Sequence, residues 1–261
     1  MESNMKLKIT TPAALSAKEV KLIARLEYEG KDVYTREGIT SYCVGEQNTD
    51  YLIRKLLKKD RLKSIVKNTY LYVPMKAPDG AWSGNEYLMA KALARGGRYY
   101  IGYSNIFYSY GFTDQVAQMV HVINEKYSIC KTLFGVRYQL VKVLPDRLYG
   151  WERRKIKNED VCFATRERAL IDVFEFYDGK RARDILRDQL WKIDLATFVD
   201  FVARYPVQKV RRRIGYCLEA LDVREKLLSK INAGVKGYSP LYDTGSNKGK
   251  INNAWRVIIN G

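Results

Sequence analysis

Apolar residues near the start of the chain recur at helical intervals and predict three helices. Residues 12–30 form the first, with Ser16 placed to cap its amino end and Gly30 to end it in the left-handed conformation. Residues 35–42 predict a short second helix capped by its first residue, and residues 49–60 predict a third. The third helix has one apolar stripe, which consists of Leu52, Ile53, Leu56 and Leu57.

The apolar spacing then changes from a helical to a strand pattern. Ile65 and Tyr70 are β-formers that flank a Lys67-Asn68 corner, and asparagine tolerates the left-handed conformation that a tight corner requires. A β-hairpin that ends at Pro74 is therefore predicted. Helix, short helix, helix and hairpin is the element order of a winged helix-turn-helix.

The remainder of the chain mixes predicted strands with predicted helices. Residues 76–84 contain one proline and two glycines and are typical of a linker. We expect an α+β protein with an N-terminal winged helix-turn-helix in residues 1–75, followed by a larger mixed α/β C-terminal domain in residues 85–261. That domain has predicted strands at 99–102, 118–123, 134–144, 160–164 and 255–259, and predicted helices at 86–94, 106–110, 166–177, 180–192, 194–204 and 208–221.

Charge narrows the class of partner. The chain of 261 residues has 46 lysines and arginines against 29 acidic residues, a net charge of +17. A positive field of this size attracts polyanions, and nucleic acid gains affinity by releasing counterions from its phosphates. A solvated cationic surface without a dedicated partner is the alternative, and the charge favours nucleic acid over it.

The third helix and the hairpin carry polar and basic residues suited to a DNA duplex. A recognition helix turns polar residues toward base edges, where arginine can bond guanine and asparagine can bond adenine. An ordinary solvated helix face is the alternative for the same lysines. We assign Asn48, Thr49, Tyr51, Arg54 and Lys55 to base edges, Lys58, Lys59 and Lys63 to phosphates, and Lys67, Asn68 and Tyr70 to the minor groove or backbone.

Two further basic clusters lie on predicted helices of the C-terminal half. A solvated helix face is the favoured interpretation. The functional alternative is an accessory phosphate surface, or a docking surface for RNA or an acidic partner. The residues concerned are Arg181, Arg183, Arg187, Lys209, Arg211 and Arg212.

Little in the sequence indicates catalysis, and we expect a protein that is not an enzyme and has no cofactor and no metal. The single histidine, His121, lies in a predicted strand, where a structural role is the commoner one. The motifs GxSxG, GxGxxG, HExxH and the P-loop do not occur. A metal-dependent nuclease built from scattered carboxylates such as Asp172, Glu175 and Asp178 stays open as an alternative.

Cysteine spacing and hydropathy indicate an intracellular protein. The four cysteines are far apart and form no CxxC pair, which argues against a zinc knuckle and favours isolated thiols in the cytoplasm. Residues 1–11 lack the apolar core of a signal peptide, and no apolar stretch approaches the ~18 residues that span a bilayer. A cytoplasmic location without membrane contact is expected.

Five segments in order resemble the AbiEi-type antitoxins of type IV toxin–antitoxin systems. This sequence departs from that family at Arg166, where proline is usual, at Tyr110, where histidine is common, and at Asn68-Thr69, where glycine is usual. The matching segments are Leu56–Leu62 with Val66–Tyr72, Tyr100–Ile106 with Tyr110–Gln115, Phe163–Asp172, Arg213–Glu219 and Asn253–Asn260.

The resemblance implies a transcriptional autorepressor. Members of that family bind repeats in their own promoter through an N-terminal winged helix. Their C-terminal domain is linked to neutralising a nucleotidyltransferase toxin without a stable complex. The partners expected by this resemblance are the double-stranded DNA of the chain's own promoter and, functionally, such a toxin. A nucleic-acid-processing enzyme and a basic protein-interaction module are the alternatives from other classes.

Overall fold

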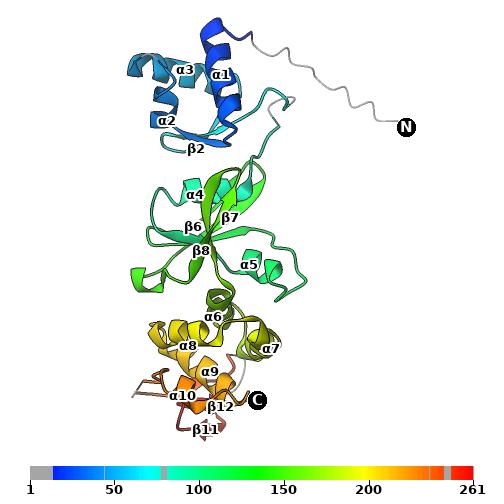
Figure 1. Ribbon diagram of the computed structural model, residues 1–261, viewed down its shortest axis with the longest axis vertical. Helices are drawn as coiled ribbons and strands as arrows, with labels where there is room; N and C mark the ends of the chain where they lie inside the picture. Colours follow the sequence, from blue (N-terminus) through cyan, green and yellow to red (C-terminus); the bar gives the residue numbers. More distant parts are fainter. Residues whose placement is uncertain (1–13, 44, 78–80, 235, 244–247, 261) are drawn as a thin grey trace, which may run out of the picture. The chain divides into compact units, whose positions relative to one another are not determined.

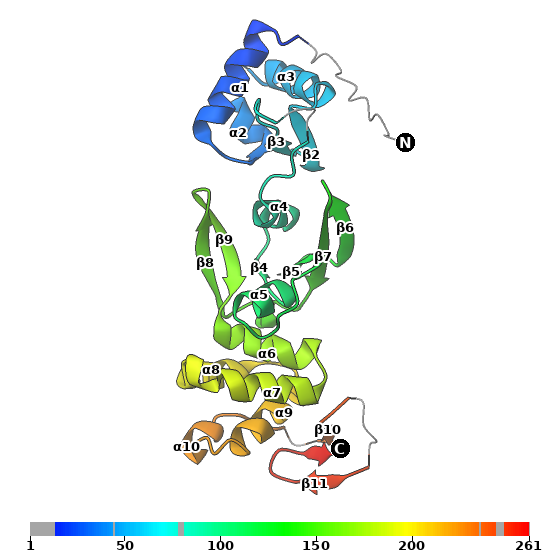
Figure 2. The ribbon, with the colours of Figure 1, turned by 90° about the vertical axis from the view of Figure 1, so that its right-hand side faces the viewer.

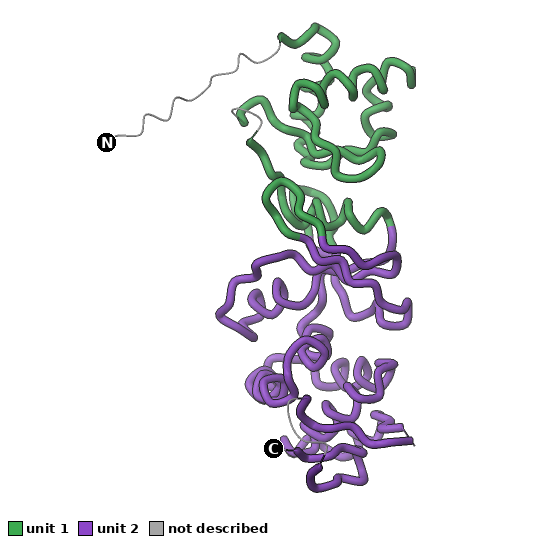
Figure 3. Tube along the Cα trace, turned by 180° about the vertical axis from the view of Figure 1, so that it is seen from behind, with its two compact units in different colours: residues 1–96, 131–137, 155–161 green, residues 97–130, 138–154, 162–261 purple. Residues whose placement is uncertain are grey.

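The protein has a mixed α+β fold with two compact units. The computed structural model describes residues 14–43, 45–77, 81–234, 236–243 and 248–260. Unit 1 lies within residues 1–96, 131–137 and 155–161, and unit 2 within residues 97–130, 138–154 and 162–261 (Figure 3). Each unit is considered by itself below.

Unit 1 contains four helices and one small antiparallel sheet among its described residues (Figure 1). The strand order of this sheet is β1-β3-β2, so the strand that follows the first helix pairs with the far strand of a hairpin. In chain order the elements are α1 (Ala17–Glu29), β1 (Val33–Thr35), α2 (Arg36–Thr40), α3 (Glu46–Lys58), β2 (Leu62–Val66), β3 (Thr69–Tyr72) and α4 (Glu86–Leu93).

The ends of α1 are formed by the two residues that the sequence indicated. Ser16 and Glu19 make a capping box, in which each side chain accepts from the other residue's backbone N–H. Gly30 ends the helix with a φ of 66°, and its N–H donates to the carbonyls of Leu26 and Glu27. Both predicted caps are confirmed.

One apolar core joins the first three helices to the sheet. Leu26, Ile39 and Leu56 come from α1, α2 and α3 in turn, and none of the three has exposed surface. The predicted stripe on α3 is confirmed for three of its residues, whereas Leu57 is only partly buried at the edge. The other core residues are Leu22, Ile23, Tyr34, Leu52, Ile53, Leu62 and Tyr72.

Two boundaries in unit 1 differ from the prediction. Helix α3 begins at Glu46 rather than at Thr49, because Gly45 with a φ of 84° starts the helix without a side-chain cap. The carbonyl of Gly45 accepts the N–H of Thr49 at 3.3 Å, so Asn48 and Thr49 lie inside the helix. Strand β1 was not predicted because only three residues pair with β3.

Six strands form the largest sheet, in the order β6-β7-β5-β4-β9-β8 (Figure 2). The central strands β4 and β5 are antiparallel to each other, whereas β5 runs parallel to β7 and β4 runs parallel to β9. The tips of the two outer hairpins, residues 131–137 and 155–161, belong to unit 1. The strands are β4 (Tyr99–Ile101), β5 (Val120–Asn124), β6 (Ile129–Leu133), β7 (Val136–Lys142), β8 (Trp151–Ile156) and β9 (Glu159–Ala164).

The outer strands of this sheet were only partly predicted. The strand expected over residues 134–144 begins at Val136, because Phe134 and Gly135 have φ angles of 50° and 84° and form a turn. Strands β6 and β8 were not predicted. Exposed and half-buried residues dominate both strands, so neither has the clean alternation of buried and exposed positions that marks a strand.

Helices make up most of the rest of unit 2. The helices up to residue 219 agree with the predicted bounds to within a few residues, whereas the short helix at residues 225–228 was not predicted. The last three strands form a small sheet of order β10-β12-β11. The elements are α5 (Ser104–Ser109), α6 (Arg166–Phe176), α7 (Gly179–Gln189), α8 (Leu195–Arg204), α9 (Gln208–Glu219), α10 (Glu225–Leu228), β10 (Ser239–Pro240), β11 (Lys250–Asn252) and β12 (Val257–Ile259).

Gly215 lets the C-terminal tail pack closely on α9. A Cβ atom at this position would lie 2.1 Å from the indole ring of Trp255, which is far inside van der Waals contact. Trp255 is itself buried, with 7% of its surface exposed. This contact anchors the C-terminal tail on the helix. Among the described residues, no helix has both the length and the apolar character that crossing a membrane requires.

A buried ion pair lies within α6. Nη2 of Arg168 lies 2.8 Å from Oδ1 of Asp172, one helical turn away, and neither side chain has exposed surface. The hydroxyl of Tyr100 donates to Oδ2 of the same carboxylate at 3.2 Å. Removing one partner of such a pair leaves the other charge buried and uncompensated.

Asp172→Ala should therefore lower the free energy of unfolding by about 3 to 5 kcal/mol. The control is Asp188→Ala, which breaks a surface pair with Arg187 and should cost less than about 1 kcal/mol. Urea denaturation followed by circular dichroism measures both. Equal effects of the two substitutions would contradict the expected cost of leaving Arg168 buried and uncompensated.

Candidate nucleic-acid interface

One face of α3 presents polar and basic side chains to solvent. Gln47, Tyr51, Arg54, Lys55 and Lys58 are all exposed, and their spacing of four, three, one and three residues places them on a single stripe. Nζ of Lys55 lies 5.4 Å from the centre of the Tyr51 ring, so the two side chains stand together. The sequence assignment omitted Gln47, although it lies one turn before Tyr51 on the same face.

An ion pair fixes α3 against the short helix α2. The Arg36 guanidinium bonds both oxygens of Asp50, with Nε to Oδ1 at 2.7 Å and Nη2 to Oδ2 at 3.0 Å. This bond lowers the pKa of Asp50, so the carboxylate stays ionised. Nε of Arg54 donates to the backbone carbonyl of Asp50 at 3.2 Å, which directs the Arg54 side chain along the helix surface.

The β2–β3 turn is tied to the same helix pair. Lys67 and Asn68 form the turn and are exposed, and Asn68 has the left-handed conformation that the sequence predicted, with a φ of 59°. The carbonyl of Asn68 accepts the backbone N–H of Arg36 at 2.8 Å. Arg36 therefore bonds the turn through its backbone N–H and bonds α3 through its side chain.

Several residues that the sequence analysis assigned to DNA do not belong to the exposed stripe of α3. Thr49 is fully buried, and its hydroxyl donates to the carbonyl of Gly45, so it presents nothing to a ligand. Asn48 and Tyr70 are half-buried at the edges of the surface. Nζ of Lys63 lies 5.6 Å from the ring of Phe134, so this ammonium faces an aromatic ring of unit 1.

Lys59 has an internal role. Its Nζ lies 2.7 Å from Oε2 of Glu19 and 2.8 Å from the carbonyl of Ala14. Burial alone would raise the pKa of Glu19, but the bonds from Lys59 and Ser16 hold it below its usual value. The charge of Lys59 is thus neutralised inside the fold, whereas the neighbouring Lys58 is exposed.

The arginines on α7 also bond within their own unit. A solvated helix face describes them only in part, because each side chain has a defined partner. The contacts are Arg181 with Thr113 at 3.2 Å and with the Tyr177 ring at 3.9 Å, Arg183 with the Tyr242 hydroxyl at 2.9 Å, and Arg187 with Asp188 at 3.1 Å.

The basic residues on α9 are still more enclosed. Arg212 is 3% exposed and donates to the carbonyls of Ala233 and Lys236 at 2.6 Å each, so the prediction of an accessible side chain is wrong. Arg211 donates to the carbonyl of Ala203 at 3.3 Å, and Lys209 bonds the carboxylate of Asp243. Lys209 and Arg212 thus hold the chain that follows α10, whereas Arg211 bonds the end of α8.

The carboxylates considered for a nuclease each have another partner. Asp172 pairs with Arg168, Glu175 pairs with Arg147, and Asp178 caps α7 by accepting the N–H groups of Lys180 and Arg181. Over the part of the chain that the structure describes, no group of three or more histidine, cysteine, aspartate or glutamate side chains is arranged to hold a metal ion.

His121 lies in the core of unit 2 beside aromatic rings. Its Nδ1 is 2.9 Å from the Ser104 hydroxyl, and the rings of Tyr103 and Phe176 lie within 6 Å of it, at 5.6 and 5.7 Å. Burial lowers the pKa of His121 to about 4, so the imidazole is neutral at physiological pH. A structural role in the strand accounts for these contacts.

Comparison with known proteins identifies a similar fold. No family model matches the sequence, and no curated protein matches it either. Among solved structures, the chain is similar to the RV2827C protein from Mycobacterium tuberculosis, with a TM-score of 0.63 and 13% sequence identity. The similarity covers 94% of this chain and 92% of that protein, so the two share an overall fold.

Lys58 and Lys59 form a matched pair for substitution. Lys59→Ala should lower the free energy of unfolding by about 1 to 3 kcal/mol, because it leaves the buried carboxylate of Glu19 without its cation. Lys58→Ala should change it by less than about 0.5 kcal/mol. Chemical denaturation of both variants is the measurement, and a Lys59→Ala variant as stable as the wild type would show that this ion pair adds nothing.

His121 should make the protein less stable in mild acid. Its pKa is about 4 in the folded state and ordinarily about 6.5, so between these values only the unfolded chain binds the proton. Stability should fall as the pH drops from about 6.5 to 4, by about 3 kcal/mol in total from this group. Because the chain has one histidine, the difference in pH dependence between the wild type and His121→Gln isolates the effect. Parallel curves for the two proteins would refute it.

Proposed function

We propose that residues 14–75 form a winged helix-turn-helix that binds double-stranded DNA, and that the protein is a sequence-specific transcriptional regulator. The observation that carries the proposal is the exposed stripe on α3 next to an exposed basic turn. Arg36 supports both, since it bonds Asp50 on α3 and the carbonyl of Asn68 in the turn. In this interpretation α3 is the recognition helix and the β2–β3 hairpin is the wing.

The geometry divides the exposed residues into two roles. Arg54 and Gln47 have the donor groups that read base edges, and both lie on the face that would enter the major groove. Lys58 lies at the far end of α3 and Lys67 in the turn, which suits contacts with phosphates that position the helix. Tyr51 and Lys55 lie between these groups and can contact either.

The biological role that we propose is transcriptional autorepression in a type IV toxin–antitoxin operon. Its support is the ordered set of sequence segments that resemble the AbiEi-type antitoxins, together with the proposed DNA-binding unit. In this role the chain acts in the cytoplasm, binds repeats in its own promoter and counters a nucleotidyltransferase toxin. It carries out no chemistry of its own.

Binding to the chain's own upstream DNA tests the proposal. The wild type should bind that DNA at least about tenfold more tightly than a scrambled duplex, and Arg54→Ala with Lys55→Ala should abolish the difference. The double change should also lower the slope of log K against log salt by about one, because Lys55 is the one of the two that can contact a phosphate. Fluorescence anisotropy at several salt concentrations measures both quantities.

A second double variant provides the control. Lys18→Ala with Lys21→Ala removes the same charge from two exposed positions on α1 and should leave the preference for upstream DNA intact. If both double variants weaken binding equally, or if the wild type does not distinguish the two duplexes, the positive charge acts only as a general polyanion surface. Sequence-specific regulation through α3 would then be wrong.

A further inference from the structure

The tip of the β6–β7 hairpin lies beside strand β2 within unit 1. Strand β2 is at one edge of the sheet of order β1-β3-β2, and its register with β3 shifts at Ile65. Nζ of Lys131 in β6 donates to the carbonyl of Ile65 at 3.0 Å. The ring of Phe134, in the turn of the hairpin, lies 5.6 Å from Nζ of Lys63 in β2. The β6–β7 hairpin is thus held next to the β2–β3 hairpin, which is the proposed wing.

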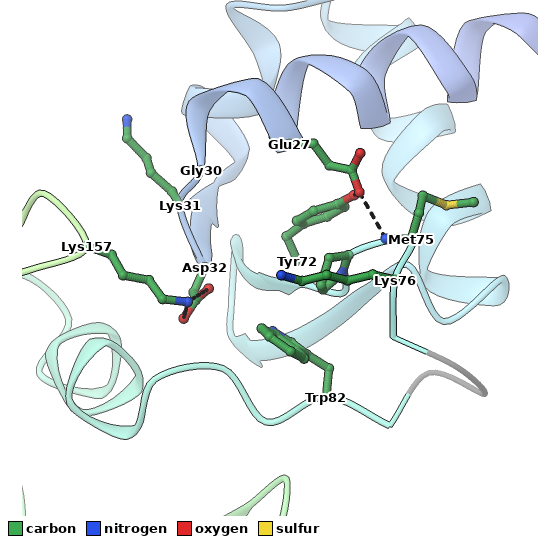
Figure 4. Close-up of a pocket in the computed structure, with 10 residues that line it drawn as sticks. Glu27, Gly30, Lys31, Asp32, Tyr72, Met75, Lys76, Trp82 and Lys157 are labelled. Carbon is green, nitrogen blue, oxygen red and sulfur yellow. Dashed lines mark hydrogen bonds and ion pairs between the residues drawn. The ribbon is translucent and has the colours of Figure 1, made fainter.

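The β8–β9 turn contacts the other edge of the same sheet. Nζ of Lys157 in this turn bonds both oxygens of Asp32, which precedes β1, at 2.8 and 3.0 Å, as Figure 4 shows. Asp32 is 5% exposed and also accepts the backbone N–H of Asn85 at 2.7 Å. The cation and the carboxylate neutralise each other, so this contact braces the sheet and presents no net charge.

The two hairpin tips differ in charge. Residues 155–161 of the β8–β9 tip contain two lysines and two acidic residues. Residues 131–137 of the β6–β7 tip contain one lysine, one arginine and no acidic residue. Residues 61–72, which include the proposed wing, contain no acidic residue either. The β6–β7 tip therefore extends the positive charge of the wing, whereas the β8–β9 tip does not.

Three cations of the two adjoining hairpins keep their charge. Lys67 in the wing and Arg137 in β7 are exposed. Lys131 is half-buried, but its acceptor is a neutral carbonyl, which leaves the ammonium charge in place. Over the ranges that the structure describes, no carboxylate lies within 4.0 Å of any of these three side chains. A polyanion would therefore compete with no internal counter-ion on this surface.

The pleat of the hairpin directs Arg137 to solvent. Residues 134–135 have left-handed φ angles of 50° and 84°, as in a tight two-residue turn. Across such a turn Thr132 lies opposite Arg137, on the face away from Leu133. Leu133 is 8% exposed, whereas Thr132 and Arg137 are both exposed. One face of the hairpin tip is therefore packed, and the other presents a hydroxyl beside a guanidinium.

We propose that the β6–β7 hairpin is a second wing, whose Arg137 and Thr132 bind phosphates of the duplex that α3 reads. The inference rests on the proposed function and adds a contact to it. Ile65 precedes Lys67 by two residues, about 7 Å along the strand, so the hairpin adjoins the surface that meets the duplex. DNA carries one charge per about 1.7 Å of its axis, so a surface extended by this length meets about four more phosphates.

A guanidinium and a hydroxyl suit this role because both donate to phosphate oxygens. Contacts with phosphates add affinity without reading the sequence. The second wing therefore contributes to the binding of every duplex, whereas the preference for one sequence comes from α3.

Arg137→Ala tests the second wing in the same anisotropy titrations. The variant should bind the upstream and the scrambled duplex about threefold to tenfold more weakly, by the same factor, and should retain the preference for upstream DNA. The slope of log K against log salt should decrease by about one, because one phosphate contact is lost. Arg137→Lys keeps the charge and should restore most of the affinity. Hydroxyl-radical footprinting of the upstream DNA should show shorter protection at one flank for Arg137→Ala.

Lys155→Ala is the matched control. It removes one cation from the β8–β9 tip, where the side chain is 70% exposed and pairs with Asp160, and it should leave affinity, salt slope and footprint unchanged. Circular dichroism checks that each variant is folded. The second wing is overturned if Arg137→Ala behaves like Lys155→Ala, or if Arg137→Lys binds as weakly as Arg137→Ala.

The double variant of α3 distinguishes this failure from failure of the proposed function. If Arg54→Ala with Lys55→Ala abolishes the preference for upstream DNA while Arg137→Ala changes nothing, only the second wing is wrong. If the double variant has no effect while Arg137→Ala weakens every duplex equally, recognition by α3 is wrong and the hairpin contact with phosphates stands. If the wild type binds neither duplex, both proposals are wrong.

Discussion

Burial of the apolar stripe of α3 determines which side chains of that helix face solvent. Leu52, Ile53 and Leu56 have between 0% and 4% of their surface exposed, and they pack against α1 and the sheet. Because successive residues on a helix are rotated by about 100°, fixing these three also fixes Arg54, Lys55 and Lys58 on the opposite side. Turning the helix by one residue would bury a charge and expose a leucine. The interface proposed on α3 follows from this packing, and the Arg36–Asp50 pair adds a bond between α2 and α3.

The net charge of +17 gives a poor measure of the surface available to a polyanion. Lys59 bonds Glu19, which is 40 positions away in sequence, and Arg212 bonds carbonyls 21 and 24 positions away. A long cationic side chain reaches partners that adjacent residues do not reveal, so counting cations along a helix cannot separate an exposed one from an enclosed one. Lys58 and Lys59 show the limit most clearly, since neighbouring lysines have opposite roles.

The fold was predictable where the signal is local. Helical spacing identified α1, α6, α8 and α9, because a helix makes its bonds within one segment. Strand β1 was missed because it is short and its partner β3 is distant in sequence, whereas β6 and β8 are edge strands without a clear alternation of buried and exposed positions. The helical pattern of the sequence identified the exposed stripe of α3 except for Gln47.

The bond between the carbonyl of Asn68 and the N–H of Arg36 has a consequence for how the hairpin would meet a partner. A hairpin turn held only by its own strands samples many conformations, and a partner must then restrict them at an entropic cost. Here the turn is fastened to the first residue of α2, so that loss of freedom occurs when the chain folds. Association through this surface would resemble the docking of two rigid bodies, with a small change in heat capacity and little ordering of the backbone.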